Sequence, residues 1–178
     1  LTLTSDGTSK FTHAVGNSAP LSSLTVNANK LTAQDAITLN GALTATVANA
    51  STISGVIANG ASTASLVKAG NGTLTLSASN TYTGTTQVSA GTLTVSGSGR
   101  LSDSAAVTVD SGATYNVAVT DTVASIAGAG SITLGSNTLT SGGSNANTTF
   151  SGVISGSSGN IVKAGSGTLT LTGNNTYT

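Results

Sequence analysis

Apolar and polar residues alternate with a period of two along most of this chain. The alternation is clear in residues 23–26, 36–39, 92–95, 106–109 and 131–134, where Val, Leu or Ile follows Thr, Ser or Ala. This period is typical of a β-strand with one buried face, and Thr suits a strand because its branched side chain fits a pleated surface. Segments such as residues 31–36 are too short to nucleate a helix. The sequence therefore predicts an all-β protein.

Short turns separate the predicted strands. Residues 69–72, 97–99 and 141–143 combine Gly with Asn or Ser, which allow the positive φ of a tight corner. We expect strands of four to six residues between such turns. Strands this short occur both in β-sandwiches and in β-solenoids.

Composition favours the solenoid. Aromatic residues make up 3% of the 178 residues and charged residues 6%, with no Cys, Met or Trp. A sandwich of this length normally buries several aromatic rings and carries charges on its outer positions. In a parallel solenoid, equivalent side chains stack about 4.8 Å apart, where charges of one sign would repel each other. We therefore predict a parallel β-solenoid of about eight or nine coils, a rod about 40 Å long.

The chain contains an internal repeat. The sequence SGVI at 54–57 recurs at 151–154, VKAGNGTLTL at 67–76 recurs as VKAGSGTLTL at 162–171, and NTYT at 80–83 recurs at 175–178. The offset is 97 residues for the first block and 95 for the other two. A fainter third copy is expected at the start of the chain. We treat residues 1–178 as a single solenoid segment with repeat copies at 54–95 and 151–178.

These copies resemble the passenger-associated β-strand repeat of bacterial autotransporters. The resemblance rests on Gly-x-Gly-Thr-Leu-Thr-Leu followed by Asn-Thr-Tyr-Thr, at 70–83 and again at 165–178. It implies a right-handed parallel β-helix, exported and displayed extracellularly at the bacterial outer-membrane surface. The second copy ends at Thr178, whereas the first continues to Leu93. We therefore expect the chain to be an excerpt of a longer repetitive protein.

The charge balance limits the partners. Lys and Arg together number 5, as do Asp and Glu, so no basic field is available for nucleic acid. No apolar run approaches the roughly 20 residues of a membrane span, and we expect no membrane insertion by this segment. A net charge of zero with a mean hydropathy of +0.23 also disfavours disorder.

The ionisable residues offer little chemistry. Carbohydrate-active β-helix enzymes need acidic and basic groups flanking one bond, but the five Asp residues here are scattered. Asp103, Asp110 and Asp121 are the closest set, with Arg100 nearby, and we expect all three Asp residues at turns. His13 could not form a zinc site with Cys or Glu ligands, because the chain contains neither residue. We therefore predict no catalytic, cofactor or metal site, and no enzymatic activity.

Two further residue types recur within the repeat. Lys68 and Lys163 are expected to mark the same corner of the motif, several coils apart. Tyr82 and Tyr177 are expected to be repeated packing or edge residues, with a surface contact as the lesser alternative.

Three functions are compatible with such a rod. The first is an extracellular structural and adhesive rod that associates with itself, stacks on neighbouring repeats or contacts host surfaces or polysaccharide. The second is an ice-binding solenoid, suggested by Thr-x-Thr at 73–75, 92–94, 138–140 and 168–170, although the gaps of 19, 46 and 30 residues are irregular. The third is a carbohydrate-active enzyme, which is disfavoured mainly because the acidic residues are few and scattered.

Overall fold

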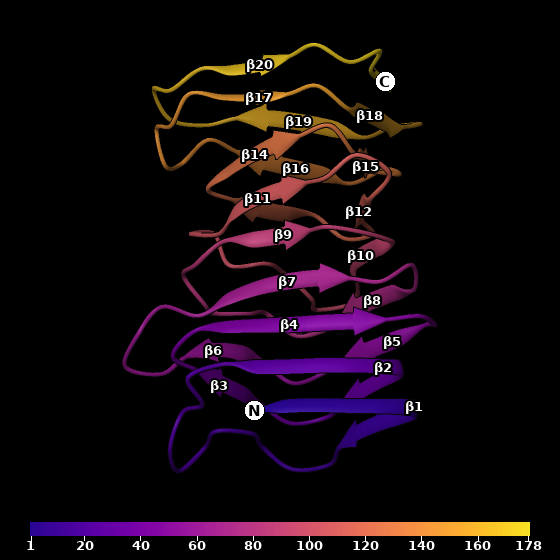
Figure 1. Ribbon diagram of the computed structural model, residues 1–178. Helices are drawn as coiled ribbons and strands as arrows, with labels where there is room; N and C mark the ends of the chain where they lie inside the picture. Colours follow the sequence, from indigo (N-terminus) through magenta and orange to yellow (C-terminus); the bar gives the residue numbers. More distant parts are fainter.

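The chain folds into twenty-one short strands without a helix, and all of its strand pairs are parallel. The computed structural model describes residues 1–178. The strands stack in successive coils along one axis, with the N-terminus at one end and the C-terminus at the other (Figure 1). The chain has no helix long and apolar enough to cross a membrane. The predicted all-β solenoid is confirmed.

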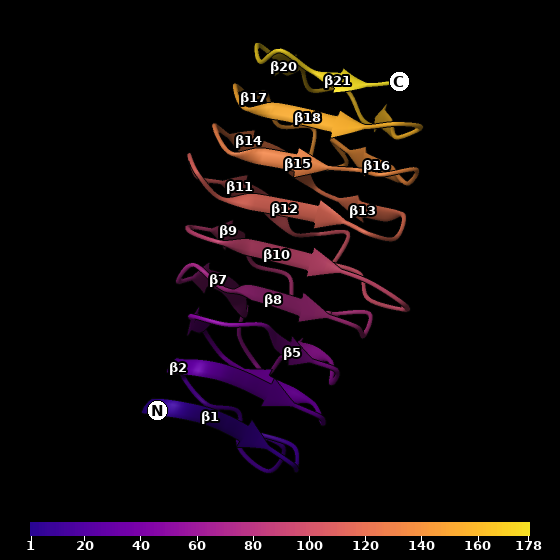
Figure 2. The ribbon, with the colours of Figure 1, turned by 90° about the vertical axis from the view of Figure 1, so that its right-hand side faces the viewer.

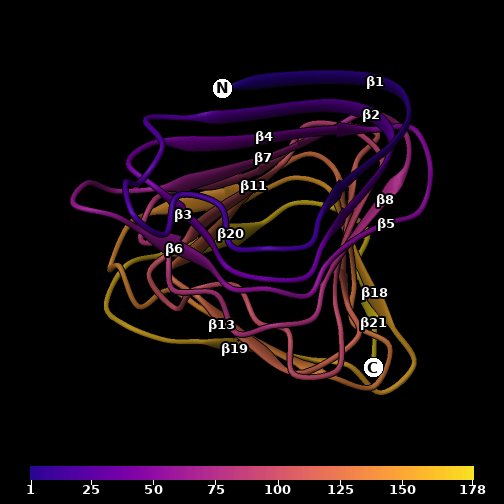
Figure 3. The same cartoon turned by 90° about the horizontal axis from the view of Figure 1, so that it is seen from below.

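The coils have three sides, which we name the first, second and third face (Figure 3). The first face consists of the first halves of β1 (Thr2–Phe11) and β2 (Leu24–Ala33), then β4 (Ala42–Val47), β7 (Ser65–Ala69), β9 (Thr86–Val88), β11 (Ala106–Val109), β14 (Ser125–Gly128), β17 (Thr148–Phe150) and β20 (Leu169–Leu171). The second face, turned toward the viewer in Figure 2, consists of the second halves of β1 and β2, then β5 (Ser51–Ile53), β8 (Thr73–Leu76), β10 (Thr92–Val95), β12 (Thr114–Val117), β15 (Ser131–Thr133), β18 (Val153–Gly156) and β21 (Thr176–Tyr177). The third face has two short sheets, one of β3 (Ile37–Leu39) and β6 (Ile57–Asn59), the other of β13 (Asp121–Val123), β16 (Thr138–Ser141) and β19 (Asn160–Lys163).

The coil is right-handed and makes about eight turns. Seen from the N-terminal end, the chain runs clockwise as it moves away from the viewer (Figure 3). Paired residues in successive coils lie between 17 positions apart, as for Thr114 and Ser131, and 23 apart, as for Leu43 and Leu66. Because strands rather than corners carry the pairing, the corners absorb this variation in length.

Aliphatic side chains fill the interior in register. On the second face, Ala33, Ile53, Leu76, Val95 and Val117 stack one upon the next. Each of these five residues is fully buried. Burial of apolar surface supplies about 25 cal/mol per Å², so the continuous column couples each coil to its neighbours. Outward positions of the same strands carry mainly Thr, Ser and Asn.

Two strands are longer than the sequence predicted. β1 and β2 each span ten residues and continue from the first face around the corner into the second. The β2 segment contains no Gly, so its backbone bends at the corner without a break in the strand. In β1 the register of pairing with β2 shifts between Ser5 and Thr8.

The two repeat copies do not lie on the same faces. In the first copy, Lys68 is the penultimate residue of β7 on the first face and Leu74 lies in β8 on the second. In the second copy, Lys163 ends β19 on the third face and Leu169 lies in β20 on the first. The offset of 95 residues is therefore not a whole number of coils. The two lysines occupy the same corner of the motif but different corners of the solenoid.

Candidate functional site

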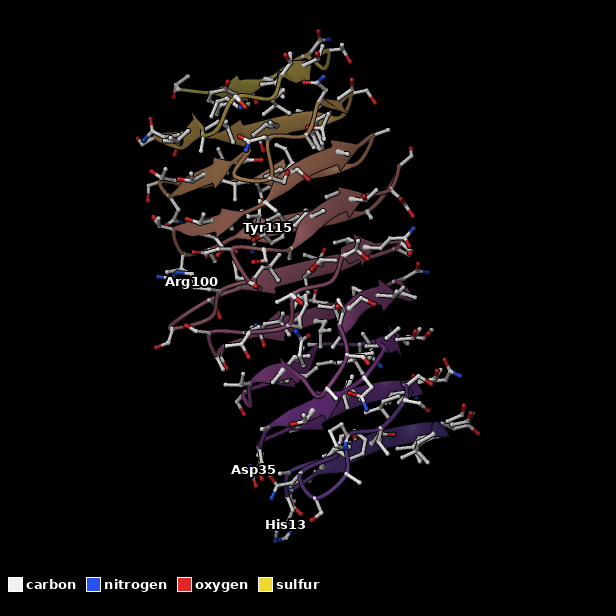
Figure 4. The ribbon with its side chains drawn as sticks, turned by 90° about the vertical axis from the view of Figure 1, so that its left-hand side faces the viewer. His13, Asp35, Arg100 and Tyr115 are labelled. Atoms are coloured by element: carbon white, nitrogen blue, oxygen red, sulfur yellow. The ribbon has the colours of Figure 1, made fainter.

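Most ionisable side chains are dispersed over the surface. Asp6, Asp35, Asp103 and His13 are exposed, and no group of three or more His, Cys, Asp or Glu residues is arranged to hold a metal ion. His13 and Asp35 lie toward the N-terminal end, whereas Arg100 lies farther along the stack (Figure 4). Asp103 lies in a turn and Asp110 directly before one, as predicted.

Asp121 is an exception, because it is buried in β13 rather than exposed in a turn. Only 1% of the residue is accessible. Its Oδ2 accepts hydrogen bonds from the Tyr115 hydroxyl at 2.5 Å and the Leu101 amide at 3.1 Å, and its Oδ1 accepts one from the Thr122 amide at 3.0 Å. The turn prediction was wrong for this residue. A signal was available in the sequence, since Asp121 alternates in phase with Val119 and Val123 and so occupies an inward position.

Burial shifts the ionisation of this buried group. Desolvation raises the pKa of Asp121 above its usual value, although three hydrogen-bond donors and the more distant Arg100 act in the opposite direction. The pKa of Tyr115 is also raised, first by burial and then by the negative charge of Asp121. Tyr115 therefore stays protonated and donates to the carboxylate. Figure 4 shows Tyr115 among the stacked coils.

Lys68 is the second buried residue, after Asp121, with a side chain of an ordinarily charged type. Its backbone position stacks between Ala45 and Val88, and the residue is fully buried. The ammonium donates hydrogen bonds to three backbone carbonyl oxygens, those of Ala69 and Gly70 at 2.8 Å and that of Ala90 at 3.0 Å. The first two belong to its own corner and the third to the corner of the following coil. Desolvation lowers the pKa of Lys68 to about 8.

The Asn and Tyr of the same repeat also join neighbouring coils. Asn80 accepts a hydrogen bond from the Ile57 amide of the preceding coil at 2.9 Å and donates to the Arg100 carbonyl of the following coil at 2.7 Å. The buried Tyr82 hydroxyl pairs with the Thr86 hydroxyl at 2.5 Å. Burial is the main reason that the pKa of Tyr82 is raised. Tyr82 is thus a packing residue, as predicted, with a polar contact to the following coil.

A groove of about 570 Å³ runs along the corner between the first and second faces near the N-terminal end. Its polar lining includes Asp6, Asn27, Asn29 and Asn71. Asn29 donates to the Asp6 carbonyl at 2.5 Å, so this amide is fixed in the wall of the groove. Such a lining has the hydrogen-bonding groups that a neutral polar ligand needs.

Comparison with known proteins identifies the repeat. The passenger-associated-transport-repeat family matches residues 66–95 and 161–178, about a quarter of the chain. No curated protein and no solved structure matches the chain. The match confirms the resemblance seen in the sequence and covers Lys68, Asn80 and Tyr82 in the first copy. The repeat and the β-solenoid both fit an autotransporter passenger domain.

Proposed function

We propose that this solenoid with two passenger-associated-transport-repeats is a structural and adhesive rod, displayed outside a bacterial cell as part of an autotransporter-like surface protein. The observation that carries the proposal is the family match within an unbroken stack of parallel coils.

Display at the surface is tested on the bacterium that produces the chain. Antibodies raised against residues 1–178 are applied to intact cells and to permeabilised cells. We expect intact cells to be labelled, and external protease to remove the label. Labelling that requires permeabilisation would reject the proposal.

The adhesive part of the role is assigned to the corner groove. Its amides and the Asp6 carboxylate suit the paired hydroxyls of a neutral polysaccharide, and the zero net charge of the chain gives no preference for a charged one. Asn71→Ala should reduce retention on immobilised neutral polysaccharides, whereas Asn174→Ala, an exposed residue far from the groove, should not. Equal retention of both variants and the parent chain would remove the groove from the proposal.

A non-catalytic role is also proposed. Asp103, Asp110 and Asp121 do not converge, because Asp121 faces the interior while Asp103 is exposed and Asp110 accepts a hydrogen bond from Gln87 at 2.9 Å. Turnover of a polysaccharide substrate, lost in Asp121→Asn, would contradict this assignment.

Ice binding is the second candidate, and one feature of the second face favours it. Thr75, Thr94, Asn116 and Thr133 stack outward in one column, beside a parallel column of Thr73, Thr92, Thr114 and Ser131. However, the pairs at 138–140 and 168–170 lie on the third and first faces, so the four Thr-x-Thr pairs do not form one ladder. Thermal hysteresis in a solution of the chain would favour this candidate, and its absence would remove it.

A further inference from the structure

Asn-Gly pairs occur at three corners of the solenoid, at residues 40–41, 59–60 and 71–72. The first two pairs follow β3 and β6 at stacked corners between the third and first faces, and the last lies between β7 and β8, where the first face meets the second. In such a pair the backbone nitrogen of the glycine can attack the asparagine side-chain carbonyl carbon, because glycine has no side chain to obstruct the approach. The three pairs share this chemistry, so the fold decides which of them reacts.

The glycine amides of the three pairs differ in hydrogen bonding. The Gly60 N–H donates to the Leu39 carbonyl at 2.6 Å, and the Gly72 N–H donates to the Val47 carbonyl at 2.9 Å. Each of these bonds between coils must break before the nitrogen can lose its proton and attack. The Gly41 N–H donates no hydrogen bond to the protein. Of the three nitrogens, that of Gly41 alone can react without separation of neighbouring coils.

The Asn40 side chain is arranged for the same reaction. Its Oδ1 accepts a hydrogen bond at 3.0 Å from the amide of Ser62, in the corner of the following coil. A donor on this oxygen stabilises the negative charge that develops when a nucleophile adds to the carbonyl carbon. Its Nδ2 has no partner in the protein and is in contact with solvent, since no buried side-chain nitrogen lacks a hydrogen bond. The nitrogen that must leave is therefore unrestrained.

The other two asparagines lack this combination. Asn59 Oδ1 also accepts a hydrogen bond, from the Ala64 amide at 2.8 Å, but its Nδ2 donates to the Thr83 hydroxyl at 2.8 Å. Asn71 is exposed, but the glycine that follows it is buried. An unbonded nucleophile, a polarised carbonyl and an unrestrained leaving group therefore meet at Asn40 and not at Asn59 or Asn71.

We propose that Asn40 is a site of spontaneous deamidation, which the fold selects over the other two Asn-Gly pairs. Hydroxide takes the Gly41 amide proton, the nitrogen forms a bond to Asn40 Cγ, and the side-chain NH2 takes up a proton from water and leaves as ammonia. Water then opens the cyclic imide at Cγ to give aspartate, or at the backbone carbonyl carbon to give isoaspartate. Either product adds a negative charge to a chain whose net charge is zero.

The reaction changes the contact between two stacked corners. Aspartate at position 40 keeps an oxygen for the Ser62 amide. Isoaspartate instead routes the main chain through Cβ and Cγ, which lengthens the corner before β4 and withdraws the acceptor from Ser62. We therefore expect residues 60–64 to loosen in the isoaspartate form. This site is independent of where the rod is displayed and of what its groove binds.

The proposal is tested by incubating the 178-residue chain in mildly alkaline buffer and then denaturing and digesting it. Tandem mass spectrometry follows conversion at each Asn-Gly pair. Synthetic peptides of residues 36–45, 55–64 and 67–76 are the unfolded references and should convert at similar rates. Relative to these references, Asn40 of the folded chain should convert at least about tenfold faster than Asn59 and Asn71, because a backbone hydrogen bond must break at the other two pairs.

Two matched variants locate the added charge. Anion-exchange chromatography should show an acidic form accumulating in the parent chain and in Asn71→Ala, but not in Asn40→Ala over the same period. Enzymatic methylation of isoaspartate should likewise label the parent chain and Asn71→Ala only. Circular dichroism checks that both variants keep their β-structure, and the mass spectrometry of the parent chain decides the question without them.

Several results would overturn the proposal. Conversion could be fastest at Asn59 or Asn71, or equal at the three pairs after division by the rates of the reference peptides. An acidic form that accumulates equally in Asn40→Ala would show that the charge arises elsewhere in the chain. If all three asparagines persisted while the reference peptides converted, the folded corner would block the reaction at Asn40 as well.

Discussion

At the scale of single residues, the interior of this solenoid tolerates polar groups only where each has a partner. No buried side-chain nitrogen or oxygen lacks a hydrogen bond. Lys68 and Asp121 are buried in different coils and make three hydrogen bonds each, mostly to backbone groups. A buried charge without such partners would cost several kcal/mol. These residues therefore fix the positions of particular corners and strands.

Asp121→Asn is expected to destabilise the chain by about 1–3 kcal/mol. Both carboxylate oxygens accept hydrogen bonds from donors, so an amide NH2 in either position faces an N–H or O–H group. Urea denaturation measures the loss. Asp103→Asn, at an exposed turn, is the control and should change the free energy of unfolding little. Equal effects of the two substitutions would show that the buried network contributes nothing.

Lys68 should make stability depend on pH in the alkaline range. Burial lowers its pKa from 10.5 to about 8, so between these values the unfolded chain binds more protons than the folded one. Stability therefore rises with pH across this window relative to a variant that does not titrate there. The free energy of unfolding of the parent chain, compared with Lys68→Met, should increase from pH 7 to pH 9.5. Comparison with the variant cancels the titration of the tyrosines, and a constant difference would contradict the shift.

At the scale of the element, the corners determine which residues are irreplaceable. Gly70 and Gly97 both have positive φ, at 73° and 63°. A Cβ on Gly70 would lie 2.5 Å from the Val47 carbonyl oxygen, whereas a Cβ on Gly97 meets nothing within 4 Å. The two glycines thus separate the cost of backbone conformation from the cost of close coil packing.

Gly97→Ala should lower the free energy of unfolding by about 1–2 kcal/mol, the cost of a left-handed conformation for an L-residue. Gly70→Ala should lower it by more, because the backbone of the adjacent coil must also move. Thermal or urea unfolding of both variants makes the comparison. If Gly97→Ala were the more damaging, contact between coils would not be what requires glycine at position 70.

The sequence predicted the elements better than their environment. Period-two segments such as 92–95 and 106–109 became β10 and β11, and Gly-containing turns such as 69–72 became corners, because both signals are local. The inward position of Lys68 was missed although Lys68 alternates in phase with the buried Leu66, because a lysine can be buried there only with the three carbonyl partners that the corners supply. The change of face between the repeat copies was also missed, because it depends on the summed length of several variable corners.

At the scale of the whole molecule, stability is expected to vary along the axis. In a stack where each coil contacts only its neighbours, the end coils have half the contacts of the central ones. Fully buried residues are frequent between β4 and β15, whereas none occurs among residues 160–178. In a polypeptide of residues 1–178, the coil of residues 160–178 should therefore open more readily than the centre.

Hydrogen exchange measures this gradient in the unliganded chain. Amides of β19, β20 and β21 should exchange at least about 100-fold faster than those of β7, β8 and β10, since local opening requires less surface exposure at the end. Uniform exchange along the axis would indicate that the solenoid opens as one cooperative unit.

The two repeat copies lie on different faces of the solenoid, so they point in different directions around its axis. A copy that begins 95 residues after another is turned by about a third of a revolution around the axis, from the first face to the third. Three copies at this spacing would point in three directions before the first orientation recurred. Contacts formed by the motif would then be distributed around the circumference, and a partner approaching from any side would meet one of them.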